Sequence, residues 1–113
     1  MKIDVRFRGL APSLELREHT QRRIHFHLSR FGAEVTAVVV RIADVNGPKA
    51  GVDKRCQVTV RGPRIDSATL NEMSADAYTA VDLAAERIGR AVGRELDRAR
   101  SDRRSGFPLG RAS

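Results

Sequence analysis

The sequence is poor in the residues that mark several familiar protein classes. It has one cysteine, no tryptophan and one tyrosine among 113 residues, and aromatic residues make up 4% of the chain. A single cysteine cannot form an internal disulfide, and the alternation of Cys56 with Val58 and Val60 predicts a buried thiol on one face of a strand. No apolar run approaches the length of a membrane span, and the first residues lack the apolar segment of a secretory signal. We therefore expect a cytoplasmic protein that does not enter a membrane.

Motifs that carry chemistry are also missing. His25 and His27 lie two residues apart, so on a helix their side chains diverge and do not form the i, i+4 pair of helical zinc sites. The sequence contains no CxxC motif, no nucleophile elbow and no glycine-rich phosphate loop. We expect neither an enzyme nor a bound metal, cofactor or small-molecule substrate.

Positive charge is what the chain has in excess. It carries 21 Lys+Arg against 14 Asp+Glu, a formal net charge of +7 and a sequence pI of about 10.9. Such a surface attracts nucleic acid electrostatically, although charge can also serve solubility alone. The length allows one domain with a core large enough to fold unaided.

Hydrophobic periodicity predicts the element order β-α-β-β-β-α. Consecutive short strands and two amphipathic helices favour an antiparallel-rich, four-stranded sheet with both helices packed on one face and the other face in solvent. The predicted strands cover 3–8, 36–45, 54–61 and 65–71, the helices cover 13–31 and 74–100, and a loop covers 46–51. Residues 1–100 then form an α/β domain, and residues 101–113 read as a flexible basic tail.

The second predicted helix separates two roles onto two faces. Arg87, Arg90, Arg94 and Arg98, the arginine row, are spaced three and four residues apart and project away from the apolar stripe. Glu86 can pair with Arg90, but little else in the row is expected to be neutralised. A solvated face is the plain alternative, yet a row of one sign indicates a polyanion. The apolar stripe consists of Ala77, Val81, Ala84, Ala85, Ile88, Val92 and Leu96.

Two glycines interrupt the same helix. Gly89 and Gly93 each cost about 1 kcal/mol relative to alanine in a helix interior. That cost is easier to understand if another backbone approaches this helix closely.

The same helix carries a resemblance to a known family. The segment Asp76-Ala77-Tyr78-Thr79-Ala80-Val81-Asp82, followed by Arg87-Ile88, Arg90 and Arg94, resembles the second-helix signature of the ribosome hibernation promoting factor family, also called ribosome-associated inhibitor or protein Y. The similarity extends over roughly residues 1–100, and the chain resembles a short form without the additional C-terminal domain. It implies a fold related to double-stranded-RNA-binding domains. It also implies a bacterial protein of stress and stationary phase that occupies the small-subunit channel of idle ribosomes and excludes messenger and transfer RNA.

The resemblance also implies partners and contact residues. The partners would be the 30S subunit, the 70S ribosome and 16S rRNA. On the second helix, the family's rRNA contacts map onto Arg87, Arg90 and Arg94, and Arg98 continues the row. On the first helix, the nearest candidates are Arg22, Arg23 and Arg30.

Phe26 occupies a region where family members often carry a basic residue. It falls on the outer face of the first helix, and we expect it to pack against the second helix, with base stacking as the alternative.

Recognition of RNA by such a domain would need no catalytic step. Duplex RNA is recognised by shape, phosphate and 2′-hydroxyl contacts, and the arginine fork suits phosphate. Two alternatives stay open. One is a small protein-interaction module that uses its exposed sheet face or edge, and the other is a generic structured-RNA-binding domain that does not act on the ribosome.

Overall fold

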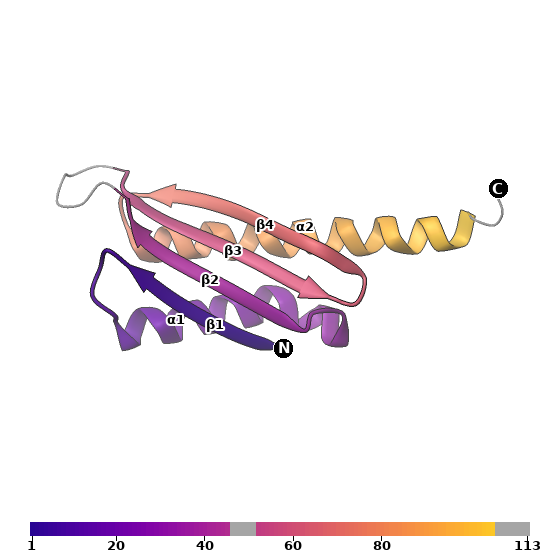
Figure 1. The fold of residues 1–113 in the computed structure, drawn as a ribbon, viewed down its shortest axis with the longest axis horizontal. Coiled ribbons are helices and arrows are strands. Elements are labelled where there is room, and N and C mark those ends of the chain that lie inside the picture. Colours follow the sequence, from indigo (N-terminus) through magenta and orange to yellow (C-terminus); the bar gives the residue numbers. More distant parts are fainter. Residues whose placement is uncertain (46–51, 106–113) are drawn as a thin grey trace.

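A computed structural model describes residues 1–45 and 52–105 of the chain. Its elements follow the predicted order β-α-β-β-β-α, with a short 3₁₀ helix, η1, added after the first helix (Figure 1). The predicted loop over 46–51 and the tail residues 106–113 lie outside the described residues. The elements are β1 (Lys2–Arg8), α1 (Leu14–Leu28), η1 (Ser29–Glu34), β2 (Ala37–Asp44), β3 (Lys54–Gly62), β4 (Ile65–Ser74) and α2 (Ala77–Ser105).

The four strands form one sheet in the order β1-β2-β3-β4. β2 pairs antiparallel with β3, and β3 pairs antiparallel with β4, because no helix intervenes and the chain turns back on itself. β1 and β2 are parallel, since α1 carries the chain from the end of β1 back to the start of β2. The antiparallel-rich sheet predicted from the sequence is therefore confirmed, with one parallel pair at its edge.

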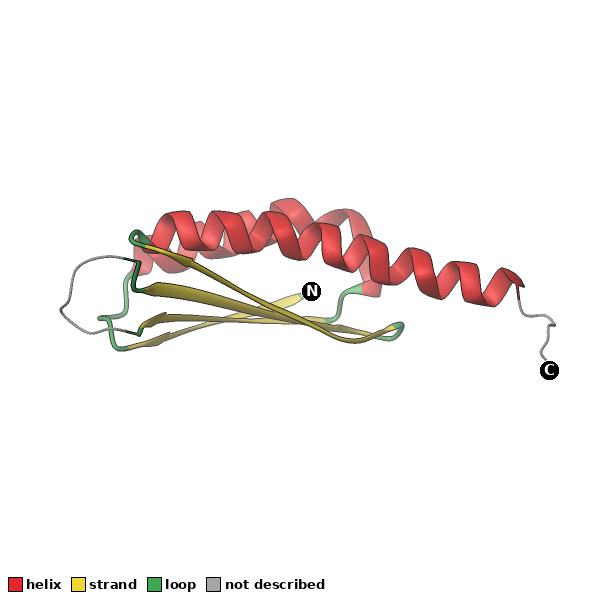
Figure 2. Ribbon diagram, turned by 90° about the horizontal axis from the view of Figure 1, so that it is seen from above, coloured by secondary structure: helices red, strands yellow, loops and turns green. Residues whose placement is uncertain are grey.

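Both helices cover the same face of this sheet (Figure 2). Register places Val5 beside Val40 and Val40 beside Val58, so the apolar faces of three strands align beneath the helices. α1 contributes Leu16, Thr20, Ile24 and Leu28 to the buried layer. α2 contributes Ala80, Val81, Ala84, Ala85, Ile88, Val92 and Leu96. The predicted stripe on α2 is thus confirmed as the face that builds the core.

α1 begins where the sequence indicated and ends earlier. The Ser13 hydroxyl accepts a hydrogen bond from the Leu16 backbone N–H at 3.1 Å and so caps the start of the helix. The α-helix stops at Leu28, its last buried residue, and the chain continues as η1 instead of reaching residue 31 as α-helix. Gly32 adopts a φ of +56° within η1, a conformation that suits glycine and interrupts the helical path.

The boundary between β4 and α2 also lies later than predicted. β4 continues to Ser74 because its backbone pairs with β3 as far as Lys54, and this ladder overrides the weak strand propensity of the sequence. The Asp76 carboxylate accepts from the Tyr78 backbone N–H at 3.1 Å, and α2 begins directly after it. α2 ends at Ser105, five residues beyond the predicted end, because no glycine or proline follows Gly93 within it. Residues 101–105 therefore continue the helix, which extends past the end of the sheet (Figure 1).

Cys56 lies in the core, as the strand alternation predicted. Its side chain is fully buried between sheet and helices. Burial, and then the nearby Glu72 carboxylate, raises the pKa of the Cys56 thiol to about 12. The thiol therefore stays protonated and unreactive at neutral pH.

Gly62, at the end of β3, is where the fold has least room for a side chain. A Cβ atom at Gly62 would lie 1.8 Å from the backbone carbonyl oxygen of Glu34 and 3.3 Å from Ile65 Cδ1. The Glu34 carbonyl is backbone, so it cannot move aside as a flexible side chain does.

We predict that Gly62→Ala lowers the free energy of unfolding by about 1–3 kcal/mol or more, because the methyl group forces the end of η1 away from β3. The measurement is thermal unfolding followed by circular dichroism. Ser67→Ala, on the exposed face of β4, is the control and should leave the midpoint nearly unchanged. Equal midpoints for Gly62→Ala and the wild type would contradict the close approach.

Candidate nucleic-acid interface

The two helices pack closely at Gly89. A Cβ atom on Gly89 would lie 3.2 Å from both the Cβ and the backbone oxygen of His27 in α1. This confirms the expectation that another backbone approaches α2 at a glycine. At Gly93 the neighbour is a side chain, since a Cβ there would lie 3.7 Å from the Phe31 ring. The outward surfaces of α1, η1 and α2 therefore join into one surface, which we call the helical face.

Four arginines converge on a groove in the helical face. The groove has a volume of about 390 Å³ and lies between η1 and the second half of α2. We call it the arginine groove, and its cationic residues are Arg30, Arg90, Arg94 and Arg100. Phe31 and Leu96 form apolar parts of its lining, and Asp97 contributes one carboxylate. Arg30 is 60 residues from Arg90 in the sequence, so folding brings these cations together.

Arg30 is held in position at this groove. One of its terminal nitrogens, Nη2, donates to the Gly89 carbonyl oxygen at 3.4 Å. Its guanidinium also lies 4.6 Å from the centroid of the Phe31 ring. Both contacts orient the cation without neutralising its charge, so Arg30 keeps its capacity to bind an anion.

The arginine row is more neutralised than the sequence indicated. Arg87 pairs with Glu72 of β4 at 2.8 Å, Arg90 pairs with Glu86 at 3.6 Å, and Arg98 pairs with Glu95. The expectation that little besides Arg90 would find a partner is therefore wrong. Glu72 escapes local pattern analysis because β4 brings it to the helix, 15 residues from Arg87. Within the described part of the chain, Arg94 forms no ion pair and its side chain is exposed.

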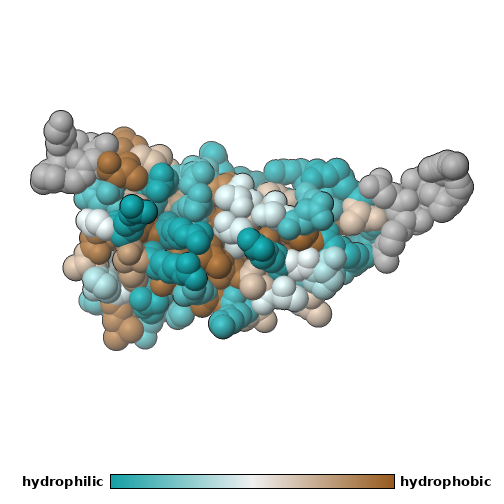
Figure 3. All heavy atoms as spheres, in the orientation of Figure 1, coloured by the Kyte–Doolittle hydropathy of each residue, from teal (hydrophilic) through white to brown (hydrophobic). Residues whose placement is uncertain are grey.

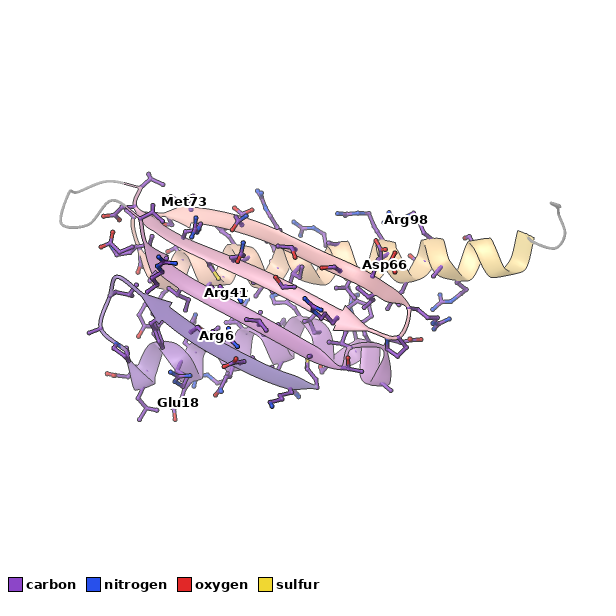
Figure 4. All side chains as sticks on the ribbon, viewed as in Figure 1. Arg6, Glu18, Arg41, Asp66, Met73 and Arg98 are labelled. Atoms are coloured by element: carbon purple, nitrogen blue, oxygen red, sulfur yellow. The ribbon has the colours of Figure 1, made fainter. Side chains whose placement is uncertain are left out.

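The structure also divides the row between two sides of α2. Arg90 and Arg94 line the arginine groove beside η1, whereas Arg87 reaches across to β4 on the other side. Arg98 projects from the more distal part of α2 (Figure 4). Only part of the row thus contributes to the groove.

The candidates on α1 differ in their surroundings. Arg22 is exposed, whereas the half-buried Arg23 has its Nε 3.5 Å from the Asp82 carboxylate and its Nη2 3.2 Å from His27 Nε2. Asp82 also binds His19 at 2.7 Å. Arg23 therefore ties α1 to α2 before any ligand arrives.

Phe26 does not pack against α2 as we expected. Its side chain is 69% exposed, and its ring contacts are the edge of His27 at 5.0 Å and the Arg23 guanidinium at 5.4 Å. Two residues along a helix correspond to a rotation of about 200°, so Phe26 points away from the buried Ile24. The packing prediction was wrong because this outward position leaves the Phe26 ring exposed instead of covered by α2.

His27 lies among cations at the helix contact. Burial lowers the pKa of His27 from its usual 6.5, and the charge of Arg23 lowers it further. Glu86 opposes this effect, while Arg30 and Arg90 add to it. His27 is therefore neutral at pH 7 and stands ready to accept a proton if an anion approaches.

The free face of the sheet carries a second group of cations. Arg6 lies directly opposite Arg41 in the β1–β2 register (Figure 4). Arg55 is exposed on β3. Arg6 is paired with Asp4 at 2.8 Å. Figure 3 shows hydrophilic side chains on this face with apolar ones between them. The free face provides a comparison surface, since its arginines belong to separate strands and border no groove described for this part of the molecule.

Other kinds of site find no support in the described residues. Within residues 1–45 and 52–105, no three His, Cys, Asp or Glu side chains gather where they could hold a metal ion. In the same part of the chain, no helix combines the length and the apolar character needed to cross a membrane.

Two solved structures have a fold similar to that of this chain. The N-terminal domain of Thermus thermophilus Protein Y superposes with a TM-score of 0.69 at 20% identity, covering 83% of this chain and 98% of that domain. A ribosomal subunit interface protein from Coxiella burnetii gives a TM-score of 0.70 at 21% identity, covering 86% of this chain and 99% of the other. These likenesses confirm the fold implied by the resemblance in the sequence. No curated protein matches the sequence significantly.

The sequence also matches the model of a protein family. The model described as Sigma 54 modulation protein / S30EA ribosomal protein matches residues 3–100, which includes all of the strands except Lys2 at the start of β1 and all of α2 except residues 101–105. Because this match spans most of the sequence, the chain belongs to the Sigma 54 modulation protein / S30EA ribosomal protein family.

Proposed function

We propose that this protein binds the small ribosomal subunit through 16S rRNA at the messenger and transfer RNA channel, and that it inactivates idle ribosomes without catalysis. The description of the family to which this chain belongs names a ribosomal protein, and this supports the ribosome as the partner. The names of the two similar structures, Protein Y and a ribosomal subunit interface protein, point the same way. Inhibition would be steric, because a domain in that channel excludes the ligands that normally occupy it.

The observation that carries this proposal is the convergence of Arg30, Arg90, Arg94 and Arg100 on one groove. Arginine forks bind phosphate oxygens bidentately, and RNA with hidden base edges is recognised through phosphates and shape. A groove bounded by cations from two elements suits a curved backbone better than a flat charged surface does. Specificity would come from the fit of the helical face to one arrangement of RNA walls.

The arginines would contribute differently to binding. Among the described residues, Arg94 and Arg30 have no carboxylate partner to release, so a phosphate gains their full attraction. Arg87, Arg90 and Arg98 must exchange a carboxylate partner for a phosphate. The Arg90–Glu86 pair is exposed on both sides and contributes only about 0–1 kcal/mol, so its exchange costs little, whereas the Glu72 side chain is only 15% exposed and makes the exchange at Arg87 more costly. Arg22 extends the cationic surface along α1, and Arg23 would act mainly by holding α1 against α2.

We predict that replacing Arg87, Arg90 and Arg94 together by glutamine abolishes most inhibition in a cell-free translation assay. The variant loses three phosphate-binding side chains from the helical face, while its core is untouched. Arg6, Arg41 and Arg55 replaced by glutamine form the matched control, because the same charge is removed from the free sheet face. The control should inhibit nearly as well as the wild type, and circular dichroism should confirm that both variants fold. Equal inhibition by the helical-face variant and the wild type would refute the proposed interface.

We predict a strong salt dependence of ribosome binding. If roughly six phosphates are contacted, affinity should fall on the order of a thousandfold between about 50 and 200 mM salt. Co-sedimentation with purified 30S subunits over that range measures it. An affinity that stays constant across the range would argue against a phosphate-dominated interface and in favour of protein contacts.

We predict that RNA binding tightens as the pH falls, and that His27 accounts for part of this change. The free protein holds the pKa of His27 below 6.5, whereas a phosphate bound beside Arg30 and Arg90 favours the imidazolium and raises that pKa. Binding then takes up a proton, so affinity increases as the pH falls through the pKa of the complex and levels off below the pKa of the free protein. The measurement is fluorescence anisotropy with a labelled rRNA fragment at several pH values. His27→Gln should weaken the pH dependence, and an identical dependence in both proteins would show that no phosphate reaches His27.

A further inference from the structure

We propose that Phe26 and the hollow beside it form a stacking site for one unpaired nucleobase of the bound RNA. This inference rests on the proposed function, since it takes RNA as the partner of the helical face. Phe26 is the most exposed of the large hydrophobic side chains described, at 69%. A single exposed aromatic ring is common on protein surfaces, and what sets Phe26 apart is that hollows and cations surround it.

The surface is hollowed on both flanks of Phe26. Toward α2, a hollow of about 330 Å³ is lined by Phe26, His27, Arg30, Glu86, Gly89 and Arg90. Toward β1, a hollow of about 550 Å³ is lined by Met1, Ile3, Gln21, Arg22, His25 and Phe26. The first borders the arginine groove through Arg30 and Arg90, so a base there would remain connected to phosphates bound in the groove.

The α2 hollow also suits the edge of a base. Glu86 offers carboxylate oxygens that accept hydrogen bonds, and Arg90 offers guanidinium donors, so a base edge that carries both an amino group and an acceptor could pair with the two. The two side chains lie 3.6 Å apart, which places acceptor and donor side by side. An unpaired base presents such an edge, whereas a base inside a duplex hides it.

The ring is held ready for stacking. The Arg23 guanidinium lies 5.4 Å from the ring centroid, and its Nη2 is hydrogen-bonded to His27 Nε2 at 3.2 Å. A ring with one side supported by a positioned cation loses little conformational entropy when a base covers its other side.

The charge around the ring decides between RNA and an apolar protein partner. Arg22, Arg23, Arg30 and Arg90 all lie at the ring or in the two hollows beside it, where Glu86 pairs with Arg90 and Asp82 lies 3.5 Å from Arg23, so cations still outnumber carboxylates among these residues. An apolar peptide would gain nothing from these cations and would have to desolvate them. A nucleotide offers both a stacking surface and a phosphate, and so matches the whole arrangement.

The test uses two RNA hairpins with the same paired stem. The first has a loop of unpaired nucleotides that include 2-aminopurine. The second has no bulge, and a non-nucleotide linker closes its stem. Loss of base stacking on an aromatic residue weakens binding by about 5- to 100-fold. We therefore expect Phe26→Leu to bind the hairpin with unpaired nucleotides that much more weakly than the wild type does, and to bind the linker-closed stem equally well. Phe26→Trp should retain binding and quench the 2-aminopurine fluorescence.

One control variant and three possible outcomes complete the test. Leu14→Ala removes an apolar side chain that is 68% exposed at the start of α1, and it should leave binding to both hairpins unchanged. If Phe26→Leu binds both hairpins as the wild type does, the stacking site is overturned and Phe26 is left as a contact for protein. If the Arg90→Gln, Arg94→Gln double variant loses binding while Phe26→Leu does not, the proposed function stands and only the stacking site fails. If the wild type binds neither hairpin nor the 30S subunit, both proposals fail.

Discussion

The contact between Gly89 of α2 and the His27 backbone of α1 sets the spacing of the two helices. Everything on the helical face depends on that spacing. It lets the Arg30 side chain reach the Gly89 carbonyl oxygen, and it brings Arg23 to Asp82. A larger side chain at position 89 would push α1 away from α2 and widen the groove between them. Gly89 therefore lowers the stability of α2 by about 1 kcal/mol relative to alanine, but it permits a close approach that places cations from both helices together.

The charges on the helical face are numerous, and they are also unevenly distributed. The carboxylates that neutralise the arginine row lie mainly on one side of it, at Glu72 and Glu95, and leave Arg94 and Arg30 without a carboxylate partner within the described residues. The pKa of His27 is lowered in the same region, which keeps an additional charge off the surface until an anion arrives. Arg94 and Arg30 can therefore gain energy from a phosphate without giving up a partner, and Arg90 can do so at little cost because its pair with Glu86 is exposed on both sides.

The sequence predicted the features that follow from local periodicity. Alternation of Val38, Val40 and Ile42 identified the buried face of β2, and the apolar stripe of α2 identified the side of the helix that carries arginine. Features that depend on distant residues were not accessible in this way. The Arg87–Glu72 pair needs β4 to lie beside α2, and the arginine groove needs Arg30 to meet Arg90 across 60 residues of sequence. Phe26 lies on the outer face that its helical position indicates, but local periodicity does not show whether a ring on that face is covered by the neighbouring helix.

The central claim is that the helical face, and not the sheet, is what RNA contacts. A cryo-EM map of 30S subunits incubated with this protein tests the claim most directly. We predict density for the domain in the messenger and transfer RNA channel, with Arg30, Arg90 and Arg94 within hydrogen-bonding distance of 16S rRNA phosphates. A map in which the free face, through Arg6, Arg41 and Arg55, meets the rRNA while α1 and α2 face solvent would contradict the account.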